Sequence, residues 1–222
     1  MADITPIDQW QLRRMKILAD MIKAMIGEYR KQAPAEAGKN CDRLESQLGE
    51  FYEFTVNEDW GGTETESQQI GQWMEKLEDV ENDLIRLFFS TFGNNSIELI
   101  HDACRREGSK WGKEARKERG KVSHDARKAL LVLNDYLING MPTDDNIEIV
   151  SSEAGQVTYI NHHCSYRERV GDSQTLAWAL CSSRQAWKDG FFEAFGGVAH
   201  QNVSARCQGD NTCMRIITLA GE

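Results

Sequence analysis

The chain of 222 residues contains only three prolines, and no apolar run approaches the roughly 18 residues that a membrane-spanning helix needs. Its first residues lack the basic and apolar stretches of a signal peptide. Disorder, a collagen-like helix and a small disulfide scaffold are excluded, because 40% of the residues are hydrophobic and 27% are charged. A chain of this length buries a real core without disulfide bonds. We therefore expect a cytoplasmic globular protein of one or two domains, without a membrane span.

A basic balance over a whole domain, the usual footprint of nucleic-acid binding, is also missing, since the formal net charge is −9. Residues 35–100 carry 15 acidic and four basic side chains, whereas residues 105–128 carry ten basic and four acidic ones. We therefore expect no nucleic-acid partner. The basic segment is most simply the solvated face of a helix, and the alternative is a docking surface for an acidic partner or an anionic ligand.

Apolar residues recur at helical spacing in the first part of the chain. This pattern predicts an amphipathic helix over residues 8–31, a second helix over 44–54 and, after a polar loop over 57–67, a third helix. The apolar residues of the third helix form a heptad-like seam: Trp73, Leu77, Val80, Leu84 and Leu87. Three phenylalanines follow the seam, which adds more apolar surface than one helical layer needs. We predict that residues 1–95 form a helical region that contributes to a homodimer.

The pattern changes along the second half of the chain. A long helix is predicted to open at Ile97, with the basic segment as its second half, and it contains Gly108 and Gly112, each of which costs ~1 kcal/mol relative to alanine in a helix. Two glycines one turn apart indicate close backbone approach to another element or to a ligand. A further helix is expected over residues 123–138.

Beyond Pro142 the sequence becomes extended and predicts two hairpins, the first over residues 146–151 and 156–164, the second over 198–206 and 213–219. A helix rich in aromatic residues, 174–195, lies between the hairpins. The predicted fold class is therefore α+β, with a helical N-terminal half and a domain over residues 96–222 in which helices pack on an antiparallel sheet.

Six cysteines in a cytoplasmic protein are expected to be mostly reduced. Cys207 and Cys213 are symmetric about Asp210, so the predicted hairpin places them opposite each other with Cβ atoms ~5 Å apart. Two thiols in this position can form a disulfide or share a metal ion. A tetrahedral zinc site needs further ligands, and Cys181 on the preceding helix is the best-placed donor.

A stretch near the C-terminus resembles the 4-vinyl reductase domain, a small-molecule-binding module: AWALCSSRQAWKDGFFEAFGGVAHQNVSARCQGDNTCMRII. The resemblance depends on the helix cysteine, the Gly-Phe-Phe-Glu-Ala-Phe helix end and the final cysteine hairpin. It implies an antiparallel sheet like that of this domain and a zinc ion held by Cys181, Cys207 and Cys213. Ser204 stands where an acidic fourth ligand is expected, which leaves His200, Asp210 or a water for that position.

A second set of features is similar to the 2-aminothiazoline-4-carboxylate hydrolase family, which opens a cyclic cysteine precursor by hydrolysis. The features are the helix with Gly108 and Gly112, the strand that ends in Cys164, Leu-Cys at 180–181 and Gly-Asp-x-x-Cys at 209–213. This resemblance implies a hydrolase acting on a small cyclic substrate. Cys164 or a metal-bound water would then be the attacking group.

The densest aromatic cluster lies in the helix over residues 174–195. It can form a core or the wall of a pocket for a flat ligand, and alternation along the preceding strand sends Tyr159 and His163 to one face. The candidate ligand-binding residues are Tyr159, His163, Tyr166, Trp178, Trp187 and Phe191.

Two functions are compatible with these patterns. The first is a sensor or carrier that binds a small aromatic or hydrophobic molecule, with zinc on Cys181, Cys207, Cys213 and His200. The second is the hydrolase, with Cys164 as the catalytic residue. A catalytic metal keeps an open coordination position, whereas four protein ligands in a buried site favour binding.

Overall fold

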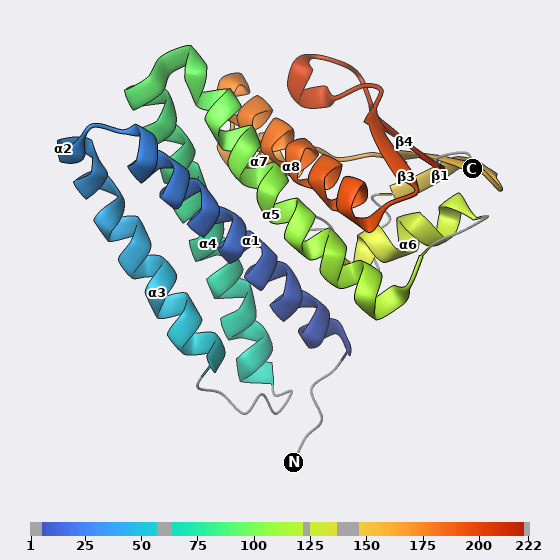
Figure 1. Ribbon diagram of the computed structural model, residues 1–222, viewed down its shortest axis with the longest axis horizontal. Coiled ribbons are helices and arrows are strands. Elements are labelled where there is room, and N and C mark those ends of the chain that lie inside the picture. Colours follow the sequence, from blue (N-terminus) through green and yellow to red (C-terminus); the bar gives the residue numbers. More distant parts are fainter. Residues whose placement is uncertain (1–5, 57–63, 122–124, 137–146, 220–222) are drawn as a thin grey trace. The chain divides into compact units, whose positions relative to one another are not determined.

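The computed structural model describes residues 6–56, 64–121, 125–136 and 147–219 (Figure 1). The chain forms two compact units, Met1–Ile100 and His101–Glu222, where the sequence predicted a boundary at residue 95. The first unit is helical and the second contains a four-stranded antiparallel sheet with packed helices. The predicted α+β fold with a helical N-terminal half is therefore confirmed. Within the described ranges no helix is long and apolar enough to cross a membrane.

The N-terminal unit contains α1 (Pro6–Gln32), α2 (Ala35–Gly38), η1 (Lys39–Cys41), α3 (Asp42–Val56), α4 (Glu64–Phe92) and η2 (Gly93–Asn95). The long helices α1, α3 and α4 pack against one another in pairs, and Figure 1 shows them side by side. The first two predicted helices agree with α1 and α3 to within two residues at each end. Residues 64–67, predicted as loop, begin α4; the rest of that predicted loop lies outside the described residues.

The apolar seam of α4 lies inside the N-terminal unit. Leu77, Val80 and Leu84 are at most 3% exposed, because α1 and α3 cover this face of the helix. At the end of α4 the ring of Phe88 lies 5.3 Å from that of Tyr29, edge to face. The seam therefore fills the unit's own core, and the homodimer stays a prediction that this buried surface does not require.

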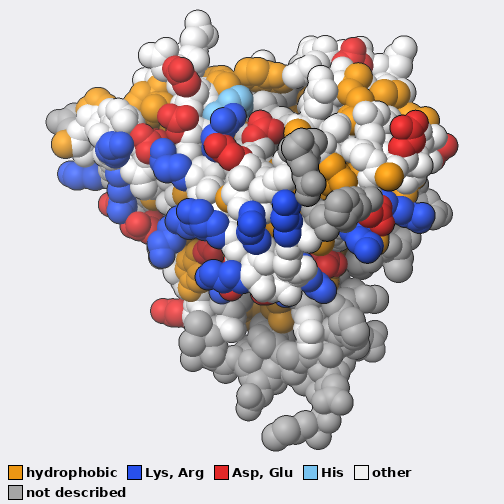
Figure 2. Space-filling view, turned by 45° about the vertical axis from the view of Figure 1, so that its right-hand side comes forward, with side chains coloured by type: hydrophobic (Ala, Val, Ile, Leu, Met, Phe, Trp, Pro, Cys, Tyr) orange, Lys and Arg blue, Asp and Glu red, His pale blue; other side chains and the backbone are white. Residues whose placement is uncertain are grey.

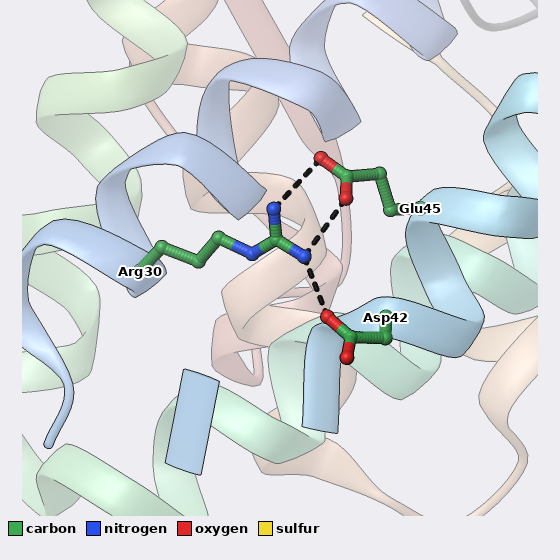
Figure 3. A network of polar contacts seen from close by, with 3 residues as sticks. All are labelled: Arg30, Asp42 and Glu45. Atoms are coloured by element: carbon green, nitrogen blue, oxygen red, sulfur yellow. Dashed lines mark hydrogen bonds and ion pairs between the residues drawn. The ribbon is translucent and has the colours of Figure 1, made fainter. Parts of the chain in front are cut away.

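A polar network joins the end of α1 to the start of α3 (Figure 3). Arg30 donates from Nη1 to Glu45 at 3.0 Å and from Nη2 to Asp42 at 2.7 Å. Exposed ion pairs contribute ~1 kcal/mol or less. The network therefore fixes the direction in which the chain turns back into α3 more than it stabilises the unit.

The C-terminal unit contains most of α5 (Ser96–Arg119), then α6 (Ala126–Tyr136), β1 (Ile147–Glu153), β2 (Gln156–Asn161), α7 (Ser165–Val170), α8 (Gln174–Phe195), β3 (Val198–Asn202), η3 (Arg206–Gln208) and β4 (Cys213–Leu219). The strand order is β1-β2-β4-β3, and every neighbouring pair is antiparallel. The α8 helix packs on β3, and α6 packs on β2 and β4. The ends of the helix predicted over 123–138 lie outside the described residues.

The structure corrects the second hairpin and the end of the first. The predicted cross-strand pair of Cys207 with Cys213 is wrong, because Arg215 pairs with Asn202 and Cys207 lies in η3. The connection forms its own wider loop, in which the Asp210 carboxylate accepts a hydrogen bond from the Ala205 N–H at 2.8 Å. The strand predicted over 156–164 ends three residues early, because the chain bends into the short helix α7, which the sequence did not predict.

Three glycines bring the backbones of α5 and α8 into direct contact. A Cβ atom on Gly108 would overlap the carbonyl oxygen of Trp187, and one on Gly112 would overlap that of Phe191. From the other side, a Cβ atom on Gly190 would overlap the carbonyl oxygen of Arg105. The close approach predicted from the two glycines in α5 is confirmed, and the partner is α8.

We expect Gly112→Ala to destabilise the C-terminal unit by about 3 kcal/mol, because a methyl group meets rigid backbone and α8 must shift. Gly49→Ala is the matched control: Gly49 lies in α3 with no atom near its missing Cβ, so this change stabilises the N-terminal unit by about 0.5–1 kcal/mol. Urea unfolding followed by circular dichroism measures both. An unchanged midpoint in Gly112→Ala would contradict the contact.

Candidate functional site

Four cysteines converge in the C-terminal unit, each from a different element. Cys181 lies on α8, Cys207 on η3, Cys213 at the start of β4, and Cys164 is the residue before α7. Cys181 and Cys207 share a buried cluster, and Cys164 packs against it. Hydrogen bonds between side chains link Cys164 to Cys213 and Cys181 to Cys207. The structure thus brings the three cysteines predicted as zinc ligands together with the predicted nucleophile, and all four are free thiols.

Local structure explains why these thiols meet. On α8, Ala177 lies one turn before Cys181 and leaves room for η3, because its side chain is a single methyl group. Alternation along β4 puts Cys213 and Arg215 on the buried face of the sheet. The bend after β2 returns Cys164 to the same place, since Asn161 is the register partner of Cys213.

Each thiol pair has a donor and an acceptor. Hydrogen bonding from Cys164 lowers the pKa of Cys213 to about 5, helped by the Arg206 N–H 3.3 Å from the sulfur and by the charge of Arg215. Hydrogen bonding from Cys207 likewise lowers the pKa of Cys181 to about 7. For the same reason the pKa values of the two donors are raised. Within each pair, one thiol therefore loses its proton more readily than its partner.

Arg215 is a buried cation beside the cluster that the sequence analysis missed. Only 7% of it is exposed, and its Nη1 donates to the carbonyl oxygen of Ser204 at 3.1 Å. Its charge favours the thiolates of Cys181 and Cys213. Burial, followed by the charge of Arg215, lowers the pKa of the nearby Lys188 to about 7. Strand alternation from Cys213 is the sequence signal that could have identified Arg215.

His200, the predicted fourth metal ligand, has hydrogen-bond partners at both ring nitrogens. Its Nε2 lies 3.1 Å from the Tyr159 hydroxyl, and its Nδ1 lies 3.1 Å from Nε2 of Gln185. The ring stacks on Phe192, and burial is the main cause that lowers its pKa well below the ordinary value. In this arrangement neither nitrogen of His200 is available to a metal, whereas Cys164 lies beside the other three thiols.

The structure distributes the six predicted ligand-binding residues over different environments. Tyr159, Trp187 and Phe191 are at most 1% exposed and belong to the core, where Trp187 stacks on Phe191 at 5.2 Å. Tyr166 is half-buried against the cysteine cluster, and Trp178 is also half-buried. His163 lies beyond the end of β2 with 71% of its side chain exposed. Binding of an aromatic ligand by these residues stays a prediction.

A cleft of about 250 Å³ lies beside the cluster, between α5, α8 and the connection that leaves β3. Cys181 belongs to its wall, but none of the six predicted ligand-binding residues does. Its other lining residues are mostly polar: His101, Arg105, Ser182, Gln185, Ala186, Asp189, Asn202, Val203, Ser204 and Gln208. No sequence pattern indicated this cleft, because its residues come together only through the packing of α5 on α8.

The basic segment of the sequence lies largely on α5. Lys and Arg side chains gather on the face of the molecule seen in Figure 2, interspersed with acidic ones. On α5, Lys110 lies 2.6 Å from Glu107 and Lys117 lies 3.1 Å from Glu114. These neighbouring opposite charges favour the interpretation as a solvated helix face, and docking of an acidic partner stays the alternative.

Comparison of the chain with protein-family models, with curated proteins and with solved structures gave no match. The resemblances to the 4-vinyl reductase domain and to the thiazoline hydrolases therefore stay predictions from short motifs. In the described part of the chain, no three His, Cys, Asp or Glu side chains already stand in metal-coordinating positions. The four thiols stand as two hydrogen-bonded pairs.

The pairing of the thiols makes a prediction for metal-free protein. Cys164→Ala removes the hydrogen bond that lowers the Cys213 pKa, so this pKa should rise from about 5 towards the ordinary 9.0. Thiolate absorbance at 240 nm is followed against pH in the presence of a chelator. In Cys164→Ala, the titration step at the lowest pH, which belongs to Cys213, should disappear. Cys41→Ala, which changes a buried cysteine of the N-terminal unit, should keep that step. A low step that persists in Cys164→Ala would contradict the pairing.

Proposed function

We propose that the C-terminal unit is a small-molecule-binding module whose elements are tied together by one zinc ion on Cys164, Cys181, Cys207 and Cys213. The observation that carries the proposal is the convergence of these four cysteines from four separate elements. The bound molecule would occupy the cleft, whose wall includes Cys181.

The chemistry of the donor set supports zinc. Four thiolates in a tetrahedron are a common structural zinc site, and zinc binds cysteine only after the thiol has lost its proton. The lowered pKa values of Cys213 and Cys181 favour this deprotonation. Four thiolates and one zinc ion carry a net charge of −2, which the buried Arg215 partly offsets. The Arg206 N–H would support the metal-bound sulfur of Cys213.

Such a zinc ion would act in folding. When bound, it supplies four strong bonds to thiolates, and a centre saturated with thiolates is a poor Lewis acid. It would hold η3, a single turn in the long connection between β3 and β4, against α8. Because η3 and the residues before it form one wall of the cleft, the metal would also fix the shape of that wall.

The hydrolase alternative has less support from the geometry. Cys164 donates its hydrogen to Cys213, and this raises its pKa, whereas a nucleophilic cysteine needs a lowered one. The pKa that the pairing lowers is that of Cys213, of which only 4% is exposed, so a substrate could reach this sulfur only after the cluster opens. Binding is therefore the function that the geometry favours.

We expect about one zinc ion per chain when the protein is purified without a chelator. Replacing each of the four cysteines by alanine, one at a time, should lower both the zinc content and the melting temperature, because three thiols hold zinc less tightly. Cys104→Ala changes a buried cysteine of α5, and His200→Ala removes the predicted histidine ligand; both should keep the zinc ion. Elemental analysis and thermal melts measure these outcomes.

Cobalt substitution and mass spectrometry distinguish zinc binding from its rivals. Tetrahedral cobalt on four thiolates gives intense absorption in the visible and near-ultraviolet, which should weaken in the four cysteine variants. Zinc-free protein with disulfides between Cys164 and Cys213 and between Cys181 and Cys207 would overturn the zinc centre. Zinc that persists in all four variants would also overturn it.

A further inference from the structure

The cleft beside the cysteine cluster presents opposite charges side by side. Arg105 of α5 and Asp189 of α8 lie across from each other, with 3.7 Å between Nη2 and Oδ2. This distance exceeds that of a good hydrogen bond, so each charge keeps capacity for another partner. The two side chains are 56% and 33% exposed, which leaves both accessible to a molecule in the cleft.

The orientation of Gln185 follows from its neighbours. Its Nε2 donates to Oδ1 of Asp189 at 2.7 Å and lies 3.1 Å from Nδ1 of His200. The reversed amide would place two acceptor oxygens 2.7 Å apart, so the nitrogen must face the carboxylate. The Gln185 oxygen Oε1 therefore points elsewhere, and among the described residues no hydrogen bond to it is found. Gln185 lines the cleft, and Oε1 is the acceptor that its side chain has left to offer a ligand there.

A third acceptor comes from the sheet. Asn202, the last residue of β3, also lines the cleft, and its Oδ1 is buried without a hydrogen-bond partner in the described part of the chain. A buried acceptor that stays unpaired costs ~1–3 kcal/mol. An unpaired acceptor therefore lies just beneath the wall of the cleft, where a small rotation of the Asn202 side chain would present it to a ligand.

Taken together, these groups match one class of ligand. Asp189, Gln185 and Asn202 offer three acceptor groups, which is the number of hydrogens on a primary ammonium group. Arg105 offers the planar donor pair that binds carboxylates. Ala186 and Val203, of which Val203 is 50% exposed, add a small apolar surface. A volume of about 250 Å³ lies below the range of drug-sized pockets.

We infer that this cleft binds a free α-amino acid as its zwitterion, with the ammonium group at Asp189, Gln185 and Asn202 and the carboxylate at Arg105. The inference rests on the proposed function only in giving the C-terminal unit a ligand, and it does not need the zinc ion. An apolar ligand would leave the acceptors unpaired. A simple anion would be repelled by the carboxylate of Asp189, and a simple cation would be repelled by the guanidinium of Arg105.

The test uses the full chain as purified and the proteinogenic L-amino acids, one at a time, by calorimetry. Cysteine and histidine are set aside because both chelate zinc. At least one of the others should bind. For that amino acid, the amine without the carboxylate and the acid without the ammonium group should each bind at least about tenfold more weakly, which corresponds to 1.4 kcal/mol.

Variants then assign the two ends of the ligand. Arg105→Gln should weaken the amino acid about tenfold but should not weaken the amine, for which the change removes only the repulsion of the Arg105 charge. Asp189→Asn should weaken both the amino acid and the amine. Arg106→Gln is the matched control, since Arg106 is the exposed neighbour of Arg105 on α5 and does not line the cleft. Circular dichroism verifies that each variant is folded.

The outcomes for amino-acid binding and for zinc content can be told apart. Absence of binding by every amino acid in the panel overturns it, as does an amine or an acid that binds as tightly as the amino acid. Equal affinity in Arg105→Gln and Arg106→Gln overturns the role of Arg105. Zinc measured on the same samples reports on the proposed function: zinc without amino-acid binding overturns only this inference, and amino-acid binding without zinc overturns only the metal centre.

Discussion

The backbone contact between α5 and α8 is the constraint on which the C-terminal unit depends. At Gly108, Gly112 and Gly190 there is no side chain to adjust, so the rotation of α8 about its own axis is fixed. Residues spaced by four along a helix share a face, and Cys181, Gln185 and Asp189 follow this spacing towards the cleft. Trp187, Phe191 and Phe195 follow the same spacing into the core. One contact therefore orients the thiol cluster, the cleft and the aromatic core.

Charge balance is the second constraint. The unit buries Arg215 on the inner face of its sheet, and a buried cation costs several kcal/mol unless an opposite charge lies near. Cys181 and Cys213 can provide that charge as thiolates, because hydrogen bonding and the charge of Arg215 both lower their pKa. This dependence is reciprocal. Any change that protonates the cluster leaves Arg215 less well compensated, and removal of Arg215 makes the thiolates more costly.

The parts of the fold predicted from the sequence are those set by local patterns. Periodicity located α1, α3 and α8, and the cost of glycine in a helix predicted the close contact of α5. The predicted hairpin register was wrong because a side chain, Asp210, closes a loop that symmetry of the cysteines does not reveal. The meeting of Cys164 with the other thiols is a tertiary event with no local signal. The aromatic residues of α8 were ambiguous, since a core and a pocket use the same side chains.

The strand order has a consequence for how the chain is assembled. β4 is the last described strand along the sequence, yet it lies in the interior of the sheet between β2 and β3. During synthesis from the N-terminus, β3 has no strand to pair with until β4 has emerged. A chain that stops before Cys213 would expose two unpaired strand edges, which are templates for aggregation. Closure of the sheet therefore waits for β4, and the fourth thiol, Cys213, arrives in the same step.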